Sequence, residues 1–330
     1  MNRIYDWLPR IVDRRVRVIG WLSLIGQLLL IASGGAVRLT GSGLGCPTWP
    51  KCTGASLTNT PEMGIHGIIE FSNRLLSAAL IVVVIVAFVF VIRMHRTRPD
   101  LFWIAFALGM SIPLQGVVGG ITVLSQLNPY VVGLHFVVSI ALVALSAILV
   151  MRIYATPGAR TRAVPAWYAM VAWVMAGFAG VTILVGILTT GSGPHAGDRN
   201  AQRNGLNSEL LQHVHSLPAY ATFGLTIVLV TAAFTLGLAT VRMAAMWLLL
   251  IQFAQIGVGL IQANTGLPGG LVVTHMVLAG LLAAATAVVL SKLTSPAVTK
   301  PDRPVSADQP GQGKINSSGS IATARNSSVK

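Results

Sequence analysis

The chain has 330 residues, of which 54% are hydrophobic and only 10% are charged, and its mean hydropathy is +0.73. A soluble domain of this length does not tolerate that balance, so the composition predicts an integral membrane protein. The formal net charge of +14 is dispersed among loops, which argues against a nucleic-acid partner.

Apolar runs of roughly 20 residues recur eight times along the chain, and each can cross a hydrocarbon core of about 30 Å. Because backbone groups in lipid must be satisfied internally, we expect all eight to be helices. The predicted fold class is therefore an all-α integral membrane protein with eight transmembrane helices. The predicted spans are 17–37, 67–92, 101–123, 131–151, 167–189, 211–237, 243–263 and 271–291.

Basic residues are distributed unevenly between the two sides of these spans. The N-terminal segment, the even-numbered loops and the C-terminal tail are rich in Arg and Lys. The odd-numbered loops hold only Arg38, Lys51, Arg199 and Arg203. The positive-inside rule then predicts a multi-pass protein of the cell membrane with both termini in the cytoplasm. The long loops and the starts of the even-numbered helices lie outside, which predicts an active centre in the outer half of the membrane.

The chain is internally repeated. Gln115 precedes His135 by twenty residues, and Gln255 precedes His275 by the same interval. A Thr-Gly-Ser-Gly motif also occurs once upstream of each pair. Repeats of this kind predict two similar units, here two pseudo-symmetric four-helix bundles.

The repeat divides the chain into five predicted segments. The bundles are preceded, joined and followed by polar stretches, and the last of these is rich in Ser, Pro, Gly and Asn, which predicts disorder. The segments are a basic cytoplasmic N-terminus (1–16), an N-terminal bundle (17–152), a cytoplasmic linker (153–166), a C-terminal bundle (167–292) and a disordered cytoplasmic tail (293–330).

Two histidines of the C-terminal bundle lie near the outer starts of repeat-related helices. His215 and His275 have no acidic partner in either span. Histidine is the commonest metal ligand, and an ionisable side chain within a membrane usually marks function. The pair predicts a bis-histidine haem site. The alternative is that each imidazole only hydrogen-bonds a neighbouring helix, as polar side chains do in membrane bundles.

The N-terminal bundle differs from its repeat. His135 matches His275, but Asn73, a poor iron ligand, occupies the place of His215. Glu70 is the only acidic residue well inside any span, and a carboxylate in lipid is costly and usually functional. Its alternative role is an intrahelical ion pair with Arg74, four residues later. Arg74 could also keep Glu70 ionised or hold a haem propionate.

His66 is a candidate for the missing ligand. It precedes Glu70 by one helical turn on the same face. It would, however, lie about 10 Å further out along the helix than Asn73. We therefore expect this half to hold a haem-sized site with His135 as one firm ligand, His66 as a possible second ligand, and Glu70 as a catalytic acid or base.

Cys46 and Cys52 are the only cysteines of the chain and lie in the first outer loop. Disulfides persist on the outer side of the membrane, so we expect the two to be bonded. The bond could be a structural staple or a redox pair that exchanges electrons near the site.

Taken together and in this order, these residues resemble the haem A synthase family over about residues 17–292. The resemblance rests on four segments: Arg38 to Pro47 (RLTGSGLGCP), Glu70 with Arg74, Gln115 to His135, and Gly191 to Asp198 (GSGPHAGD).

The resemblance implies that the C8 methyl of haem O is oxidised to a formyl by two successive hydroxylations, giving haem A for terminal oxidases. It implies that His215 and His275 bind haem b and that His135 and Glu70 belong to the substrate site. Asn73 stands where many members have a histidine, which is a departure from the family pattern.

The expected partners are a haem O synthase, membrane lipid and terminal oxidase assembly factors, and a homo-oligomer is a further option. The main alternative function is a non-catalytic bis-histidine b-type membrane cytochrome that only transfers electrons. The buried Glu70 and the unequal halves count against it, because an electron carrier needs no acid. A transporter is less favoured, since no span is broken at its middle.

Overall fold

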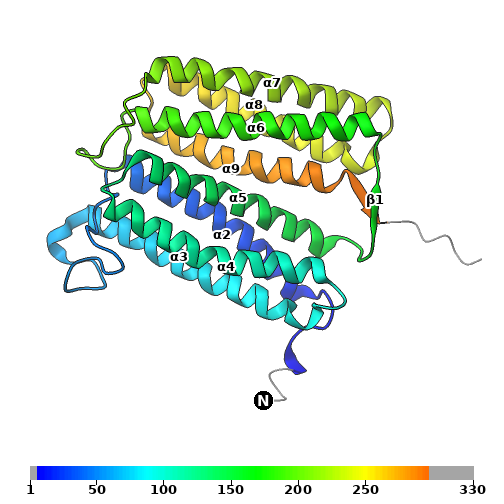
Figure 1. Cartoon of the computed structure of the whole chain (residues 1–330), viewed down its shortest axis with the longest axis horizontal. Helices are drawn as coiled ribbons and strands as arrows, with labels where there is room; N and C mark the ends of the chain where they lie inside the picture. Colours follow the sequence, from blue (N-terminus) through cyan, green and yellow to red (C-terminus); the bar gives the residue numbers. More distant parts are fainter. Residues whose placement is uncertain (1–5, 297–330) are drawn as a thin grey trace, which may run out of the picture. The chain divides into compact units, whose positions relative to one another are not determined.

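The structure is a computed structural model that describes residues 6–296. Eight long helices dominate it, and each is long and apolar enough to cross a membrane (Figure 1). This confirms the predicted all-α membrane fold. The helices are α2 (Arg14–Leu39), α3 (Gly64–Val91), α4 (Pro99–Leu124), α5 (Pro129–Tyr154), α6 (Ala166–Ser192), α7 (Ser208–Thr235), α8 (Ala239–Asn264) and α9 (Gly269–Ser291), with short 3₁₀ turns η1 (Pro61–Met63) and η2 (Ile92–Met94) flanking α3.

The two halves use the same cycle of helix contacts. In residues 14–154, α2 contacts α3, α3 contacts α4, α4 contacts α5, and α5 returns to α2; helices α6 to α9 repeat this cycle. The cycles meet where α9 packs on α5 and α2, and where α5 packs on α6. This arrangement is consistent with two four-helix bundles. The domain boundaries stay predictions.

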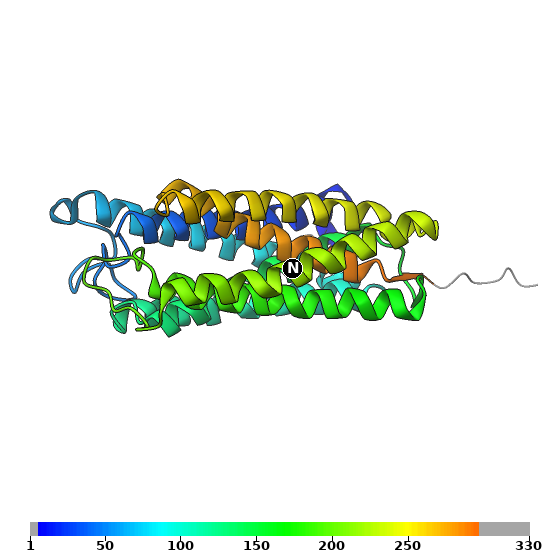
Figure 2. The same ribbon diagram turned by 90° about the horizontal axis from the view of Figure 1, so that it is seen from above.

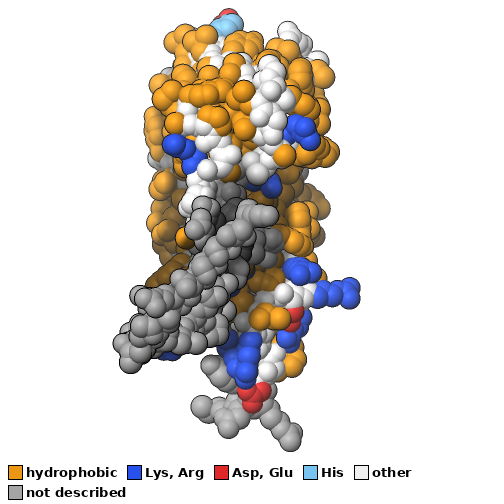
Figure 3. All heavy atoms as spheres, turned by 90° about the vertical axis from the view of Figure 1, so that its right-hand side faces the viewer, with side chains coloured by type: hydrophobic (Ala, Val, Ile, Leu, Met, Phe, Trp, Pro, Cys, Tyr) orange, Lys and Arg blue, Asp and Glu red, His pale blue; other side chains and the backbone are white. Residues whose placement is uncertain are grey.

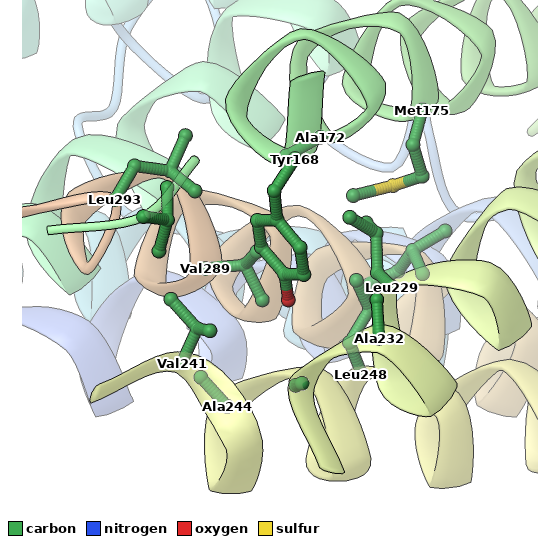
Figure 4. Close-up of a cluster of buried hydrophobic side chains, with 13 residues drawn as sticks. Tyr168, Ala172, Met175, Leu229, Ala232, Val241, Ala244, Leu248, Val289 and Leu293 are labelled. Carbon is green, nitrogen blue, oxygen red and sulfur yellow. The ribbon is translucent and has the colours of Figure 1, made fainter. Parts of the chain in front are cut away.

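Side-chain exposure follows from this packing. Seven of the eight long helices expose large apolar side chains, as helices in lipid do, whereas α9 exposes none. The reason is that α9 lies at the junction, against α2, α5, α6 and α8. Figure 4 shows the core of the second half, where the fully buried Tyr168 of α6 points between Val289, Leu229 and Leu248 of three other helices.

Polar caps and prolines shape the helices locally. The Asp13 carboxylate accepts a hydrogen bond from Val16 N–H at the start of α2, and the Asn207 side chain caps α7 in the same way. Pro113 and Pro218 lie inside α4 and α7, and both helices continue through them. Membrane helices tolerate such prolines because neighbouring helices can satisfy the backbone groups that the proline frees.

The long loops 40–60 and 193–207 lie together at one end of the helices, here called the long-loop end (Figures 1 and 2). They are joined by a hydrogen bond of 2.8 Å from Gly43 N–H to Gly197 O. This brings the two predicted outer loops to one face.

The opposite end, here called the strand-pair end, carries β1 (Arg160–Arg162) and β2 (Thr294–Pro296), which pair antiparallel. Figure 3 views the protein from this end and shows basic side chains gathered there. The strand pair corrects the sequence prediction, which gave no strand and began a disordered tail at residue 293. Apolar periodicity cannot reveal three-residue strands that pair across 134 residues. The rest of that predicted tail, 297–330, and residues 1–5 lie outside the described residues.

Candidate functional site

His215 of α7 and His275 of α9 face each other within the second half. Their ring centroids are 6.3 Å apart and the rings are inclined by 65°. Two imidazole nitrogens that each bind one metal at about 2 Å place their ring centres roughly 6 Å apart. The spacing of this pair therefore fits a single metal ion bound between the two rings.

The His215 ring is oriented by a backbone carbonyl. Its Nδ1 lies 2.9 Å from the Thr182 carbonyl oxygen, which can only accept a hydrogen bond. Nδ1 therefore carries the hydrogen and donates, and Nε2 keeps its lone pair. This is the usual arrangement of a metal-binding histidine, whose second nitrogen is held by an outer hydrogen bond.

A glycine on a neighbouring helix lies against each of the three embedded histidine rings. A Cβ atom on Gly186 would lie 2.8 Å from Cε1 of His215, and Cβ atoms on Gly259 and Gly119 would lie 3.2 and 3.3 Å from His275 and His135. The sequence analysis missed these glycines. A signal was present, because Gly119 and Gly259 each follow the repeated glutamine by four residues.

His135 and His275 share a second feature. The Nδ1 atom of each ring is buried and has no hydrogen-bond partner among residues 6–296. A buried polar atom without a partner is costly, so such atoms suggest a bound group. The glutamines differ: Gln255 contacts Nε2 of His275 at 3.2 Å, whereas Gln115 donates to Ser139 Oγ at 2.7 Å.

The donor set suits a metal ion whose other ligands come from a prosthetic group. Across the described ranges no group of three or more His, Cys, Asp or Glu side chains is placed to hold an ion. A porphyrin supplies its own nitrogens and needs only axial ligands. His215 and His275 can supply two, whereas His135 supplies one.

Asn73, which replaces the fourth histidine, is already engaged. Its Oδ1 accepts a hydrogen bond of 2.6 Å from Ser33 Oγ, which joins α3 to α2. Among the residues that the structure describes, no ring contact joins His135 to a second histidine. The first half thus has one imidazole where the second half has two.

Glu70 is buried, with 5% of its surface exposed, and both carboxylate oxygens are bonded. Oε2 accepts from Cys46 N–H at 2.6 Å, and Oε1 accepts from Arg74 Nη2 at 2.6 Å. Arg74 also donates to the carbonyls of Cys46, Thr48 and Lys51. The predicted intrahelical pair is therefore present, and together the two side chains hold the first long loop against α3.

Cys46 and Cys52 form the predicted disulfide, with their Cα atoms 4.4 Å apart. Trp49 lies within the loop that this bond closes, and a Cβ atom on Gly120 of α4 would lie 2.5 Å from its ring. Gly120 follows Gly119, on which the His135 ring rests. The disulfide loop therefore covers the part of α4 that borders His135.

The structure places His66 at the edge of this region. Its side chain is exposed, and Nδ1 lies 2.9 Å from Ser42 Oγ, which in turn bonds to Thr40 Oγ1 at 2.7 Å. His66 thus binds the first Thr-Gly-Ser-Gly motif. No described contact joins it to His135, so its role as an iron ligand stays a prediction.

Arg38 has contacts that were not predicted from the sequence, where it was counted as an outer charge and as part of a family segment. At the end of α2, its Nη2 donates to Thr190 O at 3.0 Å and its Nε donates to His195 O. His195 itself contacts Leu267 O at 3.0 Å. This network ties the first half to the loops of the second half at the long-loop end.

The fold and its apolar helices define a multi-pass integral membrane protein of all-α class. Residues 17–287 match the model of the COX15-CtaA family, described as cytochrome oxidase assembly protein, and the chain belongs to this family.

Curated relatives agree with the family match. The chain is similar to proteins named heme A synthase from an Exiguobacterium species (30% identity over 139 residues; 41% of this chain and 44% of the relative) and Alkalihalophilus pseudofirmus (28% over 145; 44% and 48%). A third is from Staphylococcus epidermidis (36% over 141; 40% and 43%). The matched stretches span less than half of each relative's length.

Proposed function

We propose that this protein is a haem A synthase, which oxidises the C8 methyl of haem O to a formyl group. The proposal is supported by the family match, by the relatives that carry this name, and by the facing pair His215 and His275. The proposal rests mainly on this histidine pair, because the spacing of its rings suits a haem iron. The first half, with one embedded imidazole and one buried acid, is suited to a substrate haem.

In this proposal His215 and His275 would hold haem b. Bound there, haem b supplies a one-electron redox centre. Thr182 fixes the His215 ring through its carbonyl, and Gly186 and Gly259 leave room for the two rings. These residues thereby set the orientation of the cofactor.

The substrate haem O binds in the first half, where His135 ligates its iron and orients the porphyrin. Two successive hydroxylations with oxygen from water each replace one C–H bond of the methyl by a C–OH bond. Each releases two protons and passes two electrons to an external electron acceptor, and the resulting hydrate loses water to give the aldehyde. Glu70 accepts protons released in these steps or stabilises positive charge at the reacting carbon. Arg74 keeps Glu70 ionised, and the disulfide loop limits the access of water to the site.

The cellular setting follows from the charge distribution. The strand-pair end faces the cytoplasm, both termini are on the cytoplasmic side, and the active centre is in the outer half of the membrane. A haem O synthase supplies the substrate, and terminal oxidase assembly consumes the product.

Extraction of haems from membranes that contain the protein and a haem O synthase tests the proposal. We expect haem A to accumulate at the expense of haem O, and to be absent when His135 is replaced by Ala. His215→Ala and His275→Ala should each abolish or shift the b-type absorption while the protein stays in the membrane. An unchanged spectrum in both variants would remove the haem b assignment.

The alternative is a b-type membrane cytochrome that only transfers electrons. One observation favours it: both oxygens of Glu70 are engaged in holding the disulfide loop, which is a sufficient structural role. The same extraction decides between the two functions. A cytochrome would yield haem b and leave haem O unconverted.

A further inference from the structure

A groove runs along the protein where the two halves meet, towards the strand-pair end. It has a volume of about 450 Å³ and is formed by α5, α6 and α9. Most of its lining is apolar and small, and includes Ala144, Ile148, Ala176, Gly180 and Ala283. This groove is separate from the histidine site, because it shares no residue with it.

Only one end of the groove is polar. Arg152, in the last turn of α5, and Ser291, the last residue of α9, both line it there. Thr286 lines it one to two turns deeper, and its hydroxyl oxygen is buried without a partner in the described part of the chain. The groove thus combines a long apolar wall with a polar, basic end.

The charge at this end exceeds what the nearby carboxylate neutralises. Asp100 is bound by Arg98 through two contacts of 3.0 Å each, and among residues 6–296 the Arg152 side chain has no hydrogen bond or ion pair. Arg160 is held at the same place by the carbonyls of Ser291 and Thr294. Burial and then the nearby Arg152 charge lower the pKa of the Arg160 guanidinium. The guanidinium groups of Arg98, Arg152 and Arg160 therefore share the carboxylate of Asp100.

The length of the groove matches one leaflet of a bilayer. From Ala144 to Arg152 the α5 wall is about 12 Å long, at 1.5 Å per residue. Half of a hydrocarbon core is about 15 Å. An acyl chain that enters the groove from the membrane therefore reaches its end when its headgroup is level with the arginines. Basic pockets between helices on the cytoplasmic side are suited to anionic lipid headgroups.

We propose that this groove is a binding site for an anionic glycerophospholipid, with one acyl chain between α5, α6 and α9 and its phosphate on Arg152. The lipid joins the two halves at the strand-pair end, where Arg38 does not reach. The Thr286 hydroxyl lies near enough to the polar end to meet the ester region of the same lipid.

Lipid retention measured by native mass spectrometry tests this site. The purified full-length protein is given equal amounts of phosphatidylglycerol and phosphatidylethanolamine with identical acyl chains. We expect one phosphatidylglycerol to be retained preferentially. Arg152→Gln should lower its retention about fivefold, since a basic residue at an anionic lipid surface is worth that much. Arg162→Gln is the matched control, because Arg162 is exposed at the same end and does not line the groove.

A second pair of variants tests the apolar wall. Gly180 and Gly177 both lie on α6, and a Cβ atom at either would meet no atom within 4 Å, but only Gly180 lines the groove. Gly180→Phe should fill the groove and displace the lipid, whereas Gly177→Phe should retain it. If Gly180→Phe does not elute as a single folded species, Ala176→Leu fills the same wall with less bulk.

Three outcomes would overturn the proposal. Equal retention of both lipids would show that the headgroup charge is not recognised. Equal losses in Arg152→Gln and Arg162→Gln would show a general surface effect. Lipid retained by both groove-filling variants, or a second copy of the chain bound in place of lipid, would show that the groove holds something else.

Discussion

At the scale of single residues, Glu70 contacts both the backbone of the disulfide loop and the Arg74 guanidinium. A structural anchor and a proton acceptor are compatible in one carboxylate, because the Arg74 guanidinium pairs with the charged form. Replacing Glu70 by Gln separates the two roles. The amide oxygen of Gln can still accept the Cys46 N–H hydrogen bond, but the amide does not accept a proton.

We predict that Glu70→Gln lowers the conversion of haem O by about 10²-fold or more, as losses of general acid–base catalysis typically do, and leaves haem b in place. Haem extraction and the b-type spectrum measure the two effects. Arg74→Gln should also lower conversion, because in the proposal Arg74 keeps Glu70 ionised, so the Glu70→Gln result alone decides. Full activity in Glu70→Gln would return Glu70 to a purely structural role.

His66 is the candidate for a second ligand in the first half, since Asn73 is bonded to Ser33. We predict that His66→Ala stops conversion and weakens binding of haem O as much as His135→Ala does. Ser42→Ala removes the hydroxyl contacts to His66 Nδ1 and Thr40 Oγ1 but leaves the imidazole in place, so it should lower activity modestly. A modest and equal effect of His66→Ala and Ser42→Ala would contradict the ligand assignment.

At the scale of helices, the glycines beside the histidine rings decide whether two helices can hold a haem ligand between them. We predict that Gly186→Val displaces His215 and abolishes most haem b binding, because its Cβ atom would lie 2.8 Å from the ring. The overpacking should cost about 1–3 kcal/mol. Gly177→Val, on the same helix in open space, should keep a normal b-type spectrum per protein.

We expect the disulfide to matter for the first long loop, which it closes, more than for the haem b site. Cys46→Ser with Cys52→Ser should lower the stability of the loop by roughly 2 kcal/mol, by the entropy of a short closed ring. We expect faster proteolysis of the loop and reduced conversion, with haem b unchanged. If the pair were a redox relay, the double variant would retain a well-protected loop and lose only activity.

At the scale of the whole protein, α9 and Arg38 join the two halves and the long loops gather at one end. We predict that this end faces outwards. In the described residues both cysteines are in the disulfide, so a new cysteine can be labelled selectively. Arg199→Cys should react with a membrane-impermeant maleimide in intact cells, and Arg162→Cys should react only after the cells are opened. The reverse pattern would invert the topology.

The sequence alone determined the eight spans, because apolar runs of this length have no other stable conformation in lipid. It also determined the cysteine pair, and the repeat led to His215 and His275. The tertiary structure decided contacts that no local pattern contains. Which glycine lies beneath each ring, that Arg38 bonds to Thr190, and that Arg160–Arg162 pairs with Thr294–Pro296 all depend on residues distant in the chain. Apolar periodicity specifies which residues form helices. The close approach of backbone and side chains between helices is fixed only when the helices pack.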